Sequence, residues 1–192
     1  VQKYLYESGQ RDRALALYAR WEQLCPEFRM NKAGVELEGQ QRYAEAALYF
    51  RRAIQLNSIF SPAYSNLGSC YLSTGQLDSA QVYLEIADGL NPLSPHILMK
   101  LGDLHNRKRD FDQAEEFYEQ SLAVGDNLET QMKLLNLYEQ TDQTEKYERL
   151  LIETAGRNDA PAMIHKRLGD WYVSHDLPEK GIEQYRTALE KG

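Results

Sequence analysis

The stretch NLGSCYLSTGQLDSA, which runs from Asn66 to Ala80, decides how this chain folds. It looks helical, yet it places Gly68 and Ala80 where larger apolar side chains would normally fill a core. The stretch KLGDLHNRKRDFDQA, from Lys100 to Ala114, carries nearly the same pattern 34 residues later. A period of about 34 residues is typical of helical-repeat arrays, so tandem copies of one unit are predicted.

Two columns of small residues follow this period through most of the chain. One column consists of Gly34, Gly68, Gly102 and Gly169, and the other of Ala46, Ala80, Ala114 and Gly181. A glycine inside a helix costs about 1 kcal/mol relative to alanine, so its recurrence needs a packing reason. Two small columns in one register therefore indicate repeated close contacts between helices.

These copies resemble the tetratricopeptide repeat, whose pattern is W-x2-L-G-x2-Y, then A-x3-F, then P. The copy that fits best consists of Tyr64, Leu67, Gly68, Tyr71, Ala80, Leu84 and Pro92. In the next copy Asp126 stands where the final Pro would be. The resemblance covers almost the whole chain. It implies an all-α fold, an α-solenoid in which antiparallel helix pairs stack into a superhelix.

Each copy is then expected to contain a helix A and a helix B. Helix A is predicted at about 28–40, 62–74, 95–108, 129–140 and 162–175, and helix B at about 43–56, 77–90, 111–124, 144–155 and 178–190. The array is expected to span 1–192, with a partial repeat at 1–26, repeats at about 27–60, 61–94, 95–127 and 128–161, and a truncated repeat at 162–192. Since both ends stop within a repeat, we expect either a piece of a longer protein or capping by self-association.

Local signals refine this map. Gly75 is predicted to be a left-handed C-cap of its helix A, and Ser61 and Ser94, each followed by Pro, are predicted N-caps. The repeat at 128–161 is degenerate, because Leu135 and Tyr147 fall in the two small columns. Overpacking typically costs about 1–3 kcal/mol, so the two helices of this repeat are expected to splay apart.

Composition limits the class of partner. The 192 residues carry a net charge of −7, with 42% hydrophobic and 27% charged residues. This is a folding, soluble composition, and no stretch approaches the length of a membrane span. The acidic balance argues against nucleic-acid binding, which needs a basic surface. The sequence does not indicate a compartment: cytoplasmic is the default, and a periplasmic or membrane-tethered parent protein is compatible with it.

No catalytic residue, cofactor site or metal site is predicted, so the segment is expected not to be an enzyme. The four histidines show no paired-ligand spacing, and His105 falls in a core-facing column, where a packed, hydrogen-bonded histidine is favoured over a ligand. The two cysteines are too few for a disulfide framework. Cys70 is expected to be a buried structural thiol and Cys25 to be more exposed.

By resemblance to the family, helix A of each copy lines a concave groove. Helical spacing puts a basic residue on this face in four of five copies, and Met99 and Met132 lie beside two of them. The predicted partner-binding groove consists of Lys32, Asn66, Ser69, Met99, Lys100, Asp103, Arg107, Met132, Lys133, Asn136, Arg167 and Asp170. One interpretation is that its basic residues bind an acidic or carboxylate-bearing segment. The other is that Lys100–Asp103 and Arg167–Asp170 are internal ion pairs on a solvated surface.

The carboxylate clamp of chaperone-tail binding members is not predicted. Asn66 and Lys100 could fill two of its places, but Asn31 and Val35 stand where Lys and Asn are required, and His96 replaces the other Lys. Three functions stay open. The first is a non-catalytic protein–protein interaction scaffold that binds a partner segment in the groove. The second is an oligomerisation or structural module that forms homo-oligomers through its uncapped ends, and the third is a regulatory appendage of an enzyme outside this segment.

Overall fold

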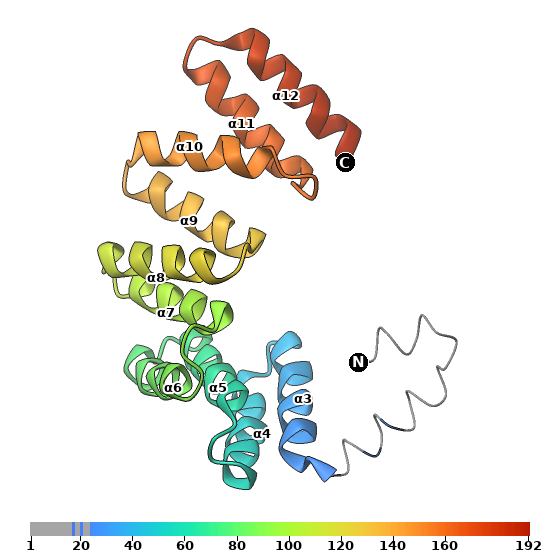
Figure 1. Cartoon of the computed structure of the whole chain (residues 1–192), viewed down its shortest axis with the longest axis vertical. Coiled ribbons are helices and arrows are strands. Elements are labelled where there is room, and N and C mark those ends of the chain that lie inside the picture. Colours follow the sequence, from blue (N-terminus) through green and yellow to red (C-terminus); the bar gives the residue numbers. More distant parts are fainter. Residues whose placement is uncertain (1–16, 18–19, 21–23) are drawn as a thin grey trace. The chain divides into compact units, whose positions relative to one another are not determined.

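The computed structural model describes residues 17, 20 and 24–192, and in this part of the chain it contains ten helices and no strand (Figure 1). They are α3 (Pro26–Gly39), α4 (Tyr43–Leu56), α5 (Ser61–Ser73), α6 (Leu77–Leu90), α7 (Pro95–Arg107), α8 (Phe111–Val124), α9 (Leu128–Gln140), α10 (Thr144–Ala155), α11 (Ala162–Ser174) and α12 (Pro178–Lys191). Every predicted helix is present, with bounds that differ by two residues at most. The expected partial repeat at 1–26 lies almost entirely outside the described residues.

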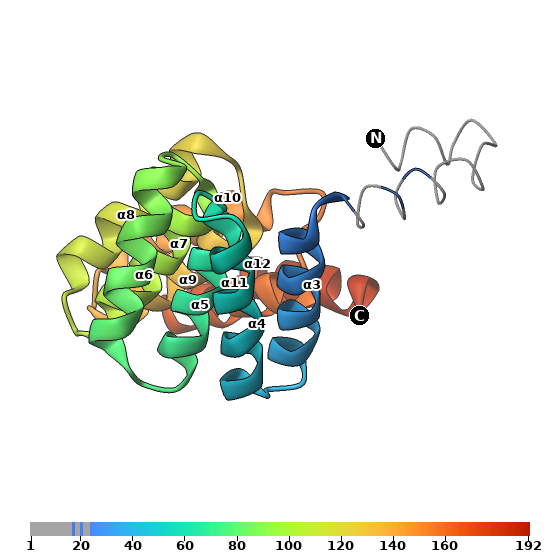
Figure 2. The same ribbon diagram turned by 90° about the horizontal axis from the view of Figure 1, so that it is seen from below.

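The chain divides into two compact units, Val1–Leu104 and His105–Gly192. In the first, α3 packs against α4 and α5 against α6, and α4 also contacts α5. In the second, α9 lies between α8 and α10, and α11 packs against α12. Figures 1 and 2 show α3 beside α4 from two directions. None of the helices in the described residues is long and apolar enough to cross a membrane.

The small residues at Gly34, Gly68 and Gly169 lie where two helices pack closely, as predicted. A Cβ atom added to Gly68 would lie 2.7 Å from Leu84 Cγ and 3.4 Å from the carbonyl oxygen of Ala80. At Gly34 and Gly169 the added atom would meet the rings of Phe50 and Tyr185 at 2.5 Å. The space beside each glycine is thus filled mainly by the large residue four positions after the second small column. This is why a glycine is needed there despite its helix penalty.

The crossing of α9 and α10 is wider than the crossings of α3 with α4, α5 with α6, and α11 with α12. Leu135 and Tyr147 occupy its small columns, and both are buried. The backbones of α9 and α10 lie close together over less of their length than those of the other three pairs. Two large side chains placed at a crossing keep the helix backbones apart, because the interior is already close-packed.

One residue in each turn between helix A and helix B has a left-handed backbone. Gly75, at φ 77°, is the predicted C-cap, and the equivalent residues Gln41, Arg109, Asp142 and Asp176 have φ between 53° and 62°. In each turn the N–H of the following residue donates a hydrogen bond to the carbonyl oxygen five positions earlier. The bond from Gln76 to Tyr71, at 2.9 Å, is an example. The sequence indicated this conformation only at Gly75. The repeat imposes it on the other four residues.

The N-cap prediction for Ser61 was wrong. Ser61 lies inside the first turn of α5, where Phe60 is the N-cap residue. Its buried hydroxyl donates to the carbonyl oxygen of Ala87 at 3.0 Å, which links α5 to α6. Packing against the neighbouring helix thus takes the hydroxyl away from its own helix end.

Cys70 is buried, as expected, and burial raises the pKa of its thiol to about 12. Cys25 is half-buried. At neutral pH the Cys70 thiol is therefore protonated and packed in the core cluster with Phe50 and Leu67. Since the thiolate is the reactive form, Cys70 has a structural role.

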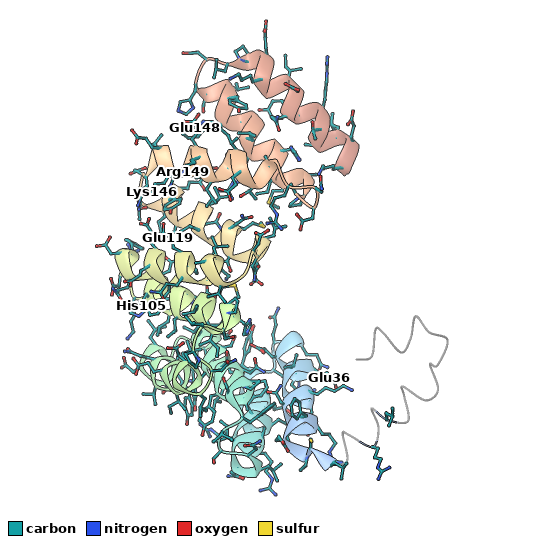
Figure 3. The ribbon with its side chains drawn as sticks, in the orientation of Figure 1. Glu36, His105, Glu119, Lys146, Glu148 and Arg149 are labelled. Carbon is teal, nitrogen blue, oxygen red and sulfur yellow. The ribbon has the colours of Figure 1, made fainter. Side chains whose placement is uncertain are left out.

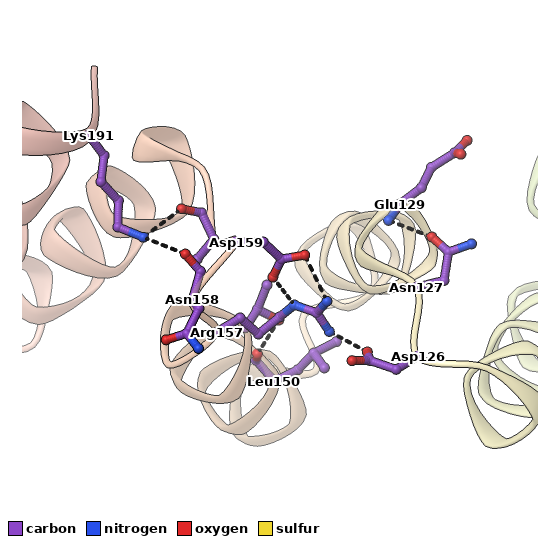
Figure 4. Close-up of polar contacts among 10 residues, drawn as sticks. Asp126, Asn127, Glu129, Leu150, Arg157, Asn158, Asp159 and Lys191 are labelled. Carbon is purple, nitrogen blue, oxygen red and sulfur yellow. Dashed lines mark hydrogen bonds and ion pairs between the residues drawn. The ribbon is translucent and has the colours of Figure 1, made fainter. Parts of the chain in front are cut away.

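Asp126, at the family's Pro position, takes part in a polar link between two loops of the second unit (Figure 4). Arg157, which follows α10, forms ion pairs with Asp126 and, at 2.8 Å, with Asp159. Lys191 of α12 donates to the carbonyl oxygens of Asn158 and Ala160 at 3.4 and 3.0 Å. A charged contact thus joins the two loops where the family pattern has a rigid proline.

Candidate partner-binding surface

In the first unit, the predicted surface residues differ in exposure. Lys32 is exposed, Lys100 and Asp103 are half-buried, and Asn66 donates to Asn31 Oδ1 at 3.0 Å. This bond joins α5 to α3, two successive A helices. Ser69 and Met99 are buried, and Met99 is only 1% exposed. Met99 therefore packs in the core and does not reach the surface at which it was predicted.

In the second unit, Arg107 and Asn136 are exposed, and Met132 is half-buried. The Lys133 ammonium lies 3.9 Å from the carboxylate of Glu129, an i,i+4 neighbour on α9. An i,i+4 pair of this kind on a helix surface typically contributes less than about 0.5 kcal/mol.

Arg167 is the most constrained of the predicted residues. Its Nη1 donates to Asn136 Oδ1 at 2.9 Å, its Nη2 to Glu139 Oε2 at 2.9 Å and its Nε to Tyr147 Oη at 3.2 Å. Its guanidinium also lies 5.5 Å from the centre of the Tyr147 ring, and the side chain is only 17% exposed. Arg167 thus joins α11 to both helices of the preceding repeat.

The suggested ion pair between Arg167 and Asp170 is replaced by two others. Arg167 pairs with Glu139, and Asp170 accepts from Lys166 Nζ at 2.8 Å and from Tyr185 Oη at 2.9 Å. The hydrogen bond from Lys166 lowers the pKa of Asp170, so this carboxylate is ionised at neutral pH. The sequence could not assign these pairs, because Glu139 lies 28 residues from Arg167.

A cleft of about 390 Å³ opens beside Arg167, between the C-terminal halves of α9 and α11 and the start of α10. We call it the α9–α11 cleft. It is lined by Tyr138, Glu139, Asp142, Thr144, Tyr147, Arg167, Asp170, Trp171 and Ser174. Arg167 and Asp170 belong to the predicted surface, whereas the aromatic residues of the lining do not. Tyr147, the bulky residue of the second small column, forms one wall of the cleft.

A second cleft, of about 370 Å³, lies between α8, α9 and α10. Its lining includes Leu122, Leu134 and Leu150, with Glu119, Lys146 and Arg149 among its charged residues (Figure 3). Both clefts adjoin the wide α9–α10 crossing and share Tyr138. The degenerate repeat is therefore the signal in the sequence that could have located them.

Beside the second cleft, Glu115 links α8 to α9 and α10. Its carboxylate accepts from Lys146 Nζ at 2.5 Å, from Tyr138 Oη at 3.1 Å and from Gln143 Nε2 at 3.2 Å. Burial opposes ionisation of this carboxylate, but the bonds from Lys146, Gln143 and Tyr138 outweigh it and lower its pKa. The degenerate repeat is thus fastened to α8 by a charged network.

His105 behaves as the sequence suggested. Its ring stacks on Phe117 at 5.2 Å, and its Nδ1 lies 3.2 Å from a carboxylate oxygen of Asp110. No group of three or more His, Cys, Asp or Glu side chains suited to a metal ion occurs within residues 17, 20 and 24–192.

Paired antiparallel helices with small residues at their crossings define a helical-hairpin repeat protein. Three family models described as tetratricopeptide repeat match the chain, at residues 3–63, 37–104 and 97–131. Together they cover residues 3–131, more than half of the 192. The chain therefore belongs to the tetratricopeptide repeat family.

Among curated proteins, anaphase-promoting complex subunit 3 of Schizosaccharomyces pombe is 29% identical over 113 residues, which are 58% of this chain and 17% of that protein. The chain spans 9–28% of the length of the curated relatives it matches.

Among solved structures, TTC0263, a thermophilic TPR protein of Thermus thermophilus, has a TM-score of 0.67 at 21% identity and covers 86% of this chain and 91% of its own. The first TPR of Spaghetti, bound to the HSP90 peptide SRMEEVD, has a TM-score of 0.56 at 17% identity and covers 60% of this chain and 93% of its own. These two likenesses establish the fold.

Proposed function

We propose that this chain is a non-catalytic protein–protein interaction scaffold, whose helix A surfaces bind a segment of a partner protein. The observation that carries the proposal is the α9–α11 cleft, which opens between two A helices beside Arg167 and Asp170. Two neighbours support it: a subunit of a multiprotein complex is related in sequence, and a similar fold was solved with a bound peptide. Since one fold serves many functions, the partner has to be argued from the surface itself.

For the lysine-bearing helix A surface of each unit, taken separately, the proposed partner segment is acidic. Lys32 and Lys100 of the first unit and Lys133 of the second reach the surface at least in part. Lysine ammonium groups on an otherwise acidic protein attract carboxylates, and salt weakens that attraction. Met99 and Ser69 are left out of this proposal because they are buried.

The first prediction concerns this lysine surface. Reversing its charge with Lys100→Glu and Lys133→Glu is expected to lower partner recovery at least tenfold at low salt. The measurement is a pull-down from a lysate with quantitative mass spectrometry. The control variant, Arg52→Glu with Arg186→Glu, makes the same change in charge on exposed positions of helix B. If both variants recover the same partners in the same amounts as the unmodified chain, the acidic-partner proposal fails.

A second candidate function, self-association, is favoured by the outer face of α12. Leu189 is 83% exposed, although Ile54, its equivalent in α4, packs against the cluster of Phe60 and Ala63. Ile182 is also exposed on this helix. In a repeat array, each such face is normally covered by the next helix pair.

The second prediction tests this candidate by size-exclusion chromatography with light scattering. If α12 mediates self-association, the mass should rise with protein concentration, and Leu189→Lys should abolish that rise. Leu48→Lys, at an exposed apolar position of α4, is the matched control and should leave it unchanged. A mass that stays monomeric at all concentrations would dismiss self-association and leave the scaffold proposal in place.

A further inference from the structure

We infer that the α9–α11 cleft binds a basic side chain, Lys or Arg, of the partner segment. This inference rests on the proposed scaffold function and deepens it, because it gives the cleft a ligand class opposite to that of the lysine surface. Four observations carry it: the charges that line the cleft, their accessibility, its aromatic walls and its origin at the wide crossing.

The first observation is the excess of carboxylates. Glu139, Asp142 and Asp170 line the cleft, and Arg167 is the only basic residue among its lining residues. Lys166, outside the lining, pairs with Asp170, and Glu139 pairs with Arg167. Asp142 is exposed in the turn after α9 and supplies a carboxylate beyond these two pairs. The summed charge of these five groups is therefore negative.

The second observation is that the negative groups are the accessible ones. The side chains of Glu139 and Asp170 are 66% and 51% exposed, whereas that of Arg167 is 17% exposed. Three of the five Arg167 N–H groups already donate hydrogen bonds within the chain. An arriving carboxylate would meet only the remaining N–H groups of a side chain that is largely covered, whereas an arriving ammonium or guanidinium would meet exposed acceptors. Charge complementarity thus favours a cation.

The third observation is the aromatic wall. The rings of Tyr147 and Trp171 lie 5.3 Å apart between centres, and both line the cleft. Arg167 already lies over the Tyr147 ring, and the centre of the His175 ring lies 3.9 Å from that of Trp171. The Tyr147 and Trp171 rings therefore offer apolar packing surface to an arriving side chain. A long Lys or Arg side chain can pack its methylene groups against such rings while its charged end reaches the carboxylates. The cleft therefore combines the two features that suit a basic side chain.

The fourth observation connects the cleft to the degenerate repeat. Tyr147 stands in a column that holds Ala or Gly at four other crossings, and it lines the cleft instead of allowing a tight crossing. Its hydroxyl and ring also hold Arg167 in place. A tyrosine at position 147, in place of a small residue, thus widens the α9–α10 crossing and forms one wall of the cleft. It also holds Arg167, the one basic residue of the lining, in contacts within the chain.

The test uses Trp171 as a fluorescent reporter in the full chain, with Trp21→Phe so that Trp171 is the sole tryptophan. The probe is an acetylated, amidated peptide Gly-Arg-Gly-Lys-Gly, and the comparison peptide is Gly-Glu-Gly-Asp-Gly. The basic peptide is expected to change Trp171 emission saturably and to lose affinity as salt rises. Glu139→Gln with Asp170→Asn, which keeps oxygen acceptors for Arg167 and Tyr185, should weaken its binding at least tenfold.

The control variant is Glu119→Gln with Glu153→Gln, which removes two carboxylates from the second cleft. It should leave the titration unchanged, and circular dichroism should show that both variants are folded. Equal or tighter binding of the acidic peptide, or a basic-peptide affinity that the Glu139 and Asp170 changes do not alter, would overturn the inference. If the basic peptide does not bind the unmodified cleft, only the ligand proposed for the cleft is refuted. If the pull-downs do not change with the lysine variants, only the lysine surface is refuted.

Discussion

Replacing Gly34 with Ala is expected to lower the free energy of unfolding by about 1–3 kcal/mol. The new Cβ atom would lie 2.5 Å from Phe50 Cε1, and Phe50 is fully buried in α4. The ring has no free space to enter, because protein interiors are close-packed. The gain in helix propensity, about 1 kcal/mol, offsets only part of this clash. Urea unfolding followed by circular dichroism measures the change.

Gly39→Ala, in the same helix, is the matched control for this prediction. A Cβ atom at Gly39 meets nothing within 4 Å, so the change should be neutral or stabilise the chain by up to about 1 kcal/mol. Adding Phe50→Leu to Gly34→Ala should cost less than the sum of the two single changes, because a smaller side chain relieves the clash. If Gly34→Ala is as stable as Gly39→Ala, the packing role of the small columns is wrong.

The other large expected effect concerns Glu115. Glu115→Ala is expected to destabilise the second unit by roughly 2–3 kcal/mol, because it removes a charged acceptor shared by three donors. The Glu115 side chain is only 14% exposed, so water replaces these bonds poorly. Glu116→Ala is the control. Glu116 follows Glu115 on the same helix and is exposed, so this change should alter stability by less than about 0.5 kcal/mol. Equal losses for the two variants would contradict the role given to Glu115.

The lowered pKa of Glu115 also fixes the sign of a pH effect. Its pKa in the folded chain lies below the ordinary value of 4.5, so its ionised form stabilises the fold. This contribution is complete above 4.5 and is lost as pH falls through the folded-state pKa. The unmodified chain should therefore lose more stability than Glu115→Gln when the pH is lowered below 4.5. Parallel stability profiles for the two chains would show that Glu115 does not carry this contribution.

Much of the fold could be predicted because it depends on spacing along the chain. The period of about 34 residues and the small columns located every described helix to within two residues. The bulky pair Leu135 and Tyr147 indicated the wide crossing, since side-chain volume alone keeps two helices apart. The left-handed turn residues Gln41, Arg109, Asp142 and Asp176 carried no such signal, because none is a glycine.

The candidate site was less predictable. Helical spacing identified Arg167 and Asp170 as surface residues near a groove, and both line the α9–α11 cleft. It also assigned Met99 to that surface, although the chain buries it. The burial of Arg167 depends on Asn136 and Glu139, which lie 31 and 28 residues away.

The sequence by itself therefore determined a tandem array of helix pairs, because residue volume and periodicity act locally and recur in every copy. Only the tertiary structure decided which charges stay accessible at the α9–α11 cleft. Electrostatic attraction depends on distances between side chains, and folding brings Arg167 to Glu139 while it leaves Asp142 at the surface.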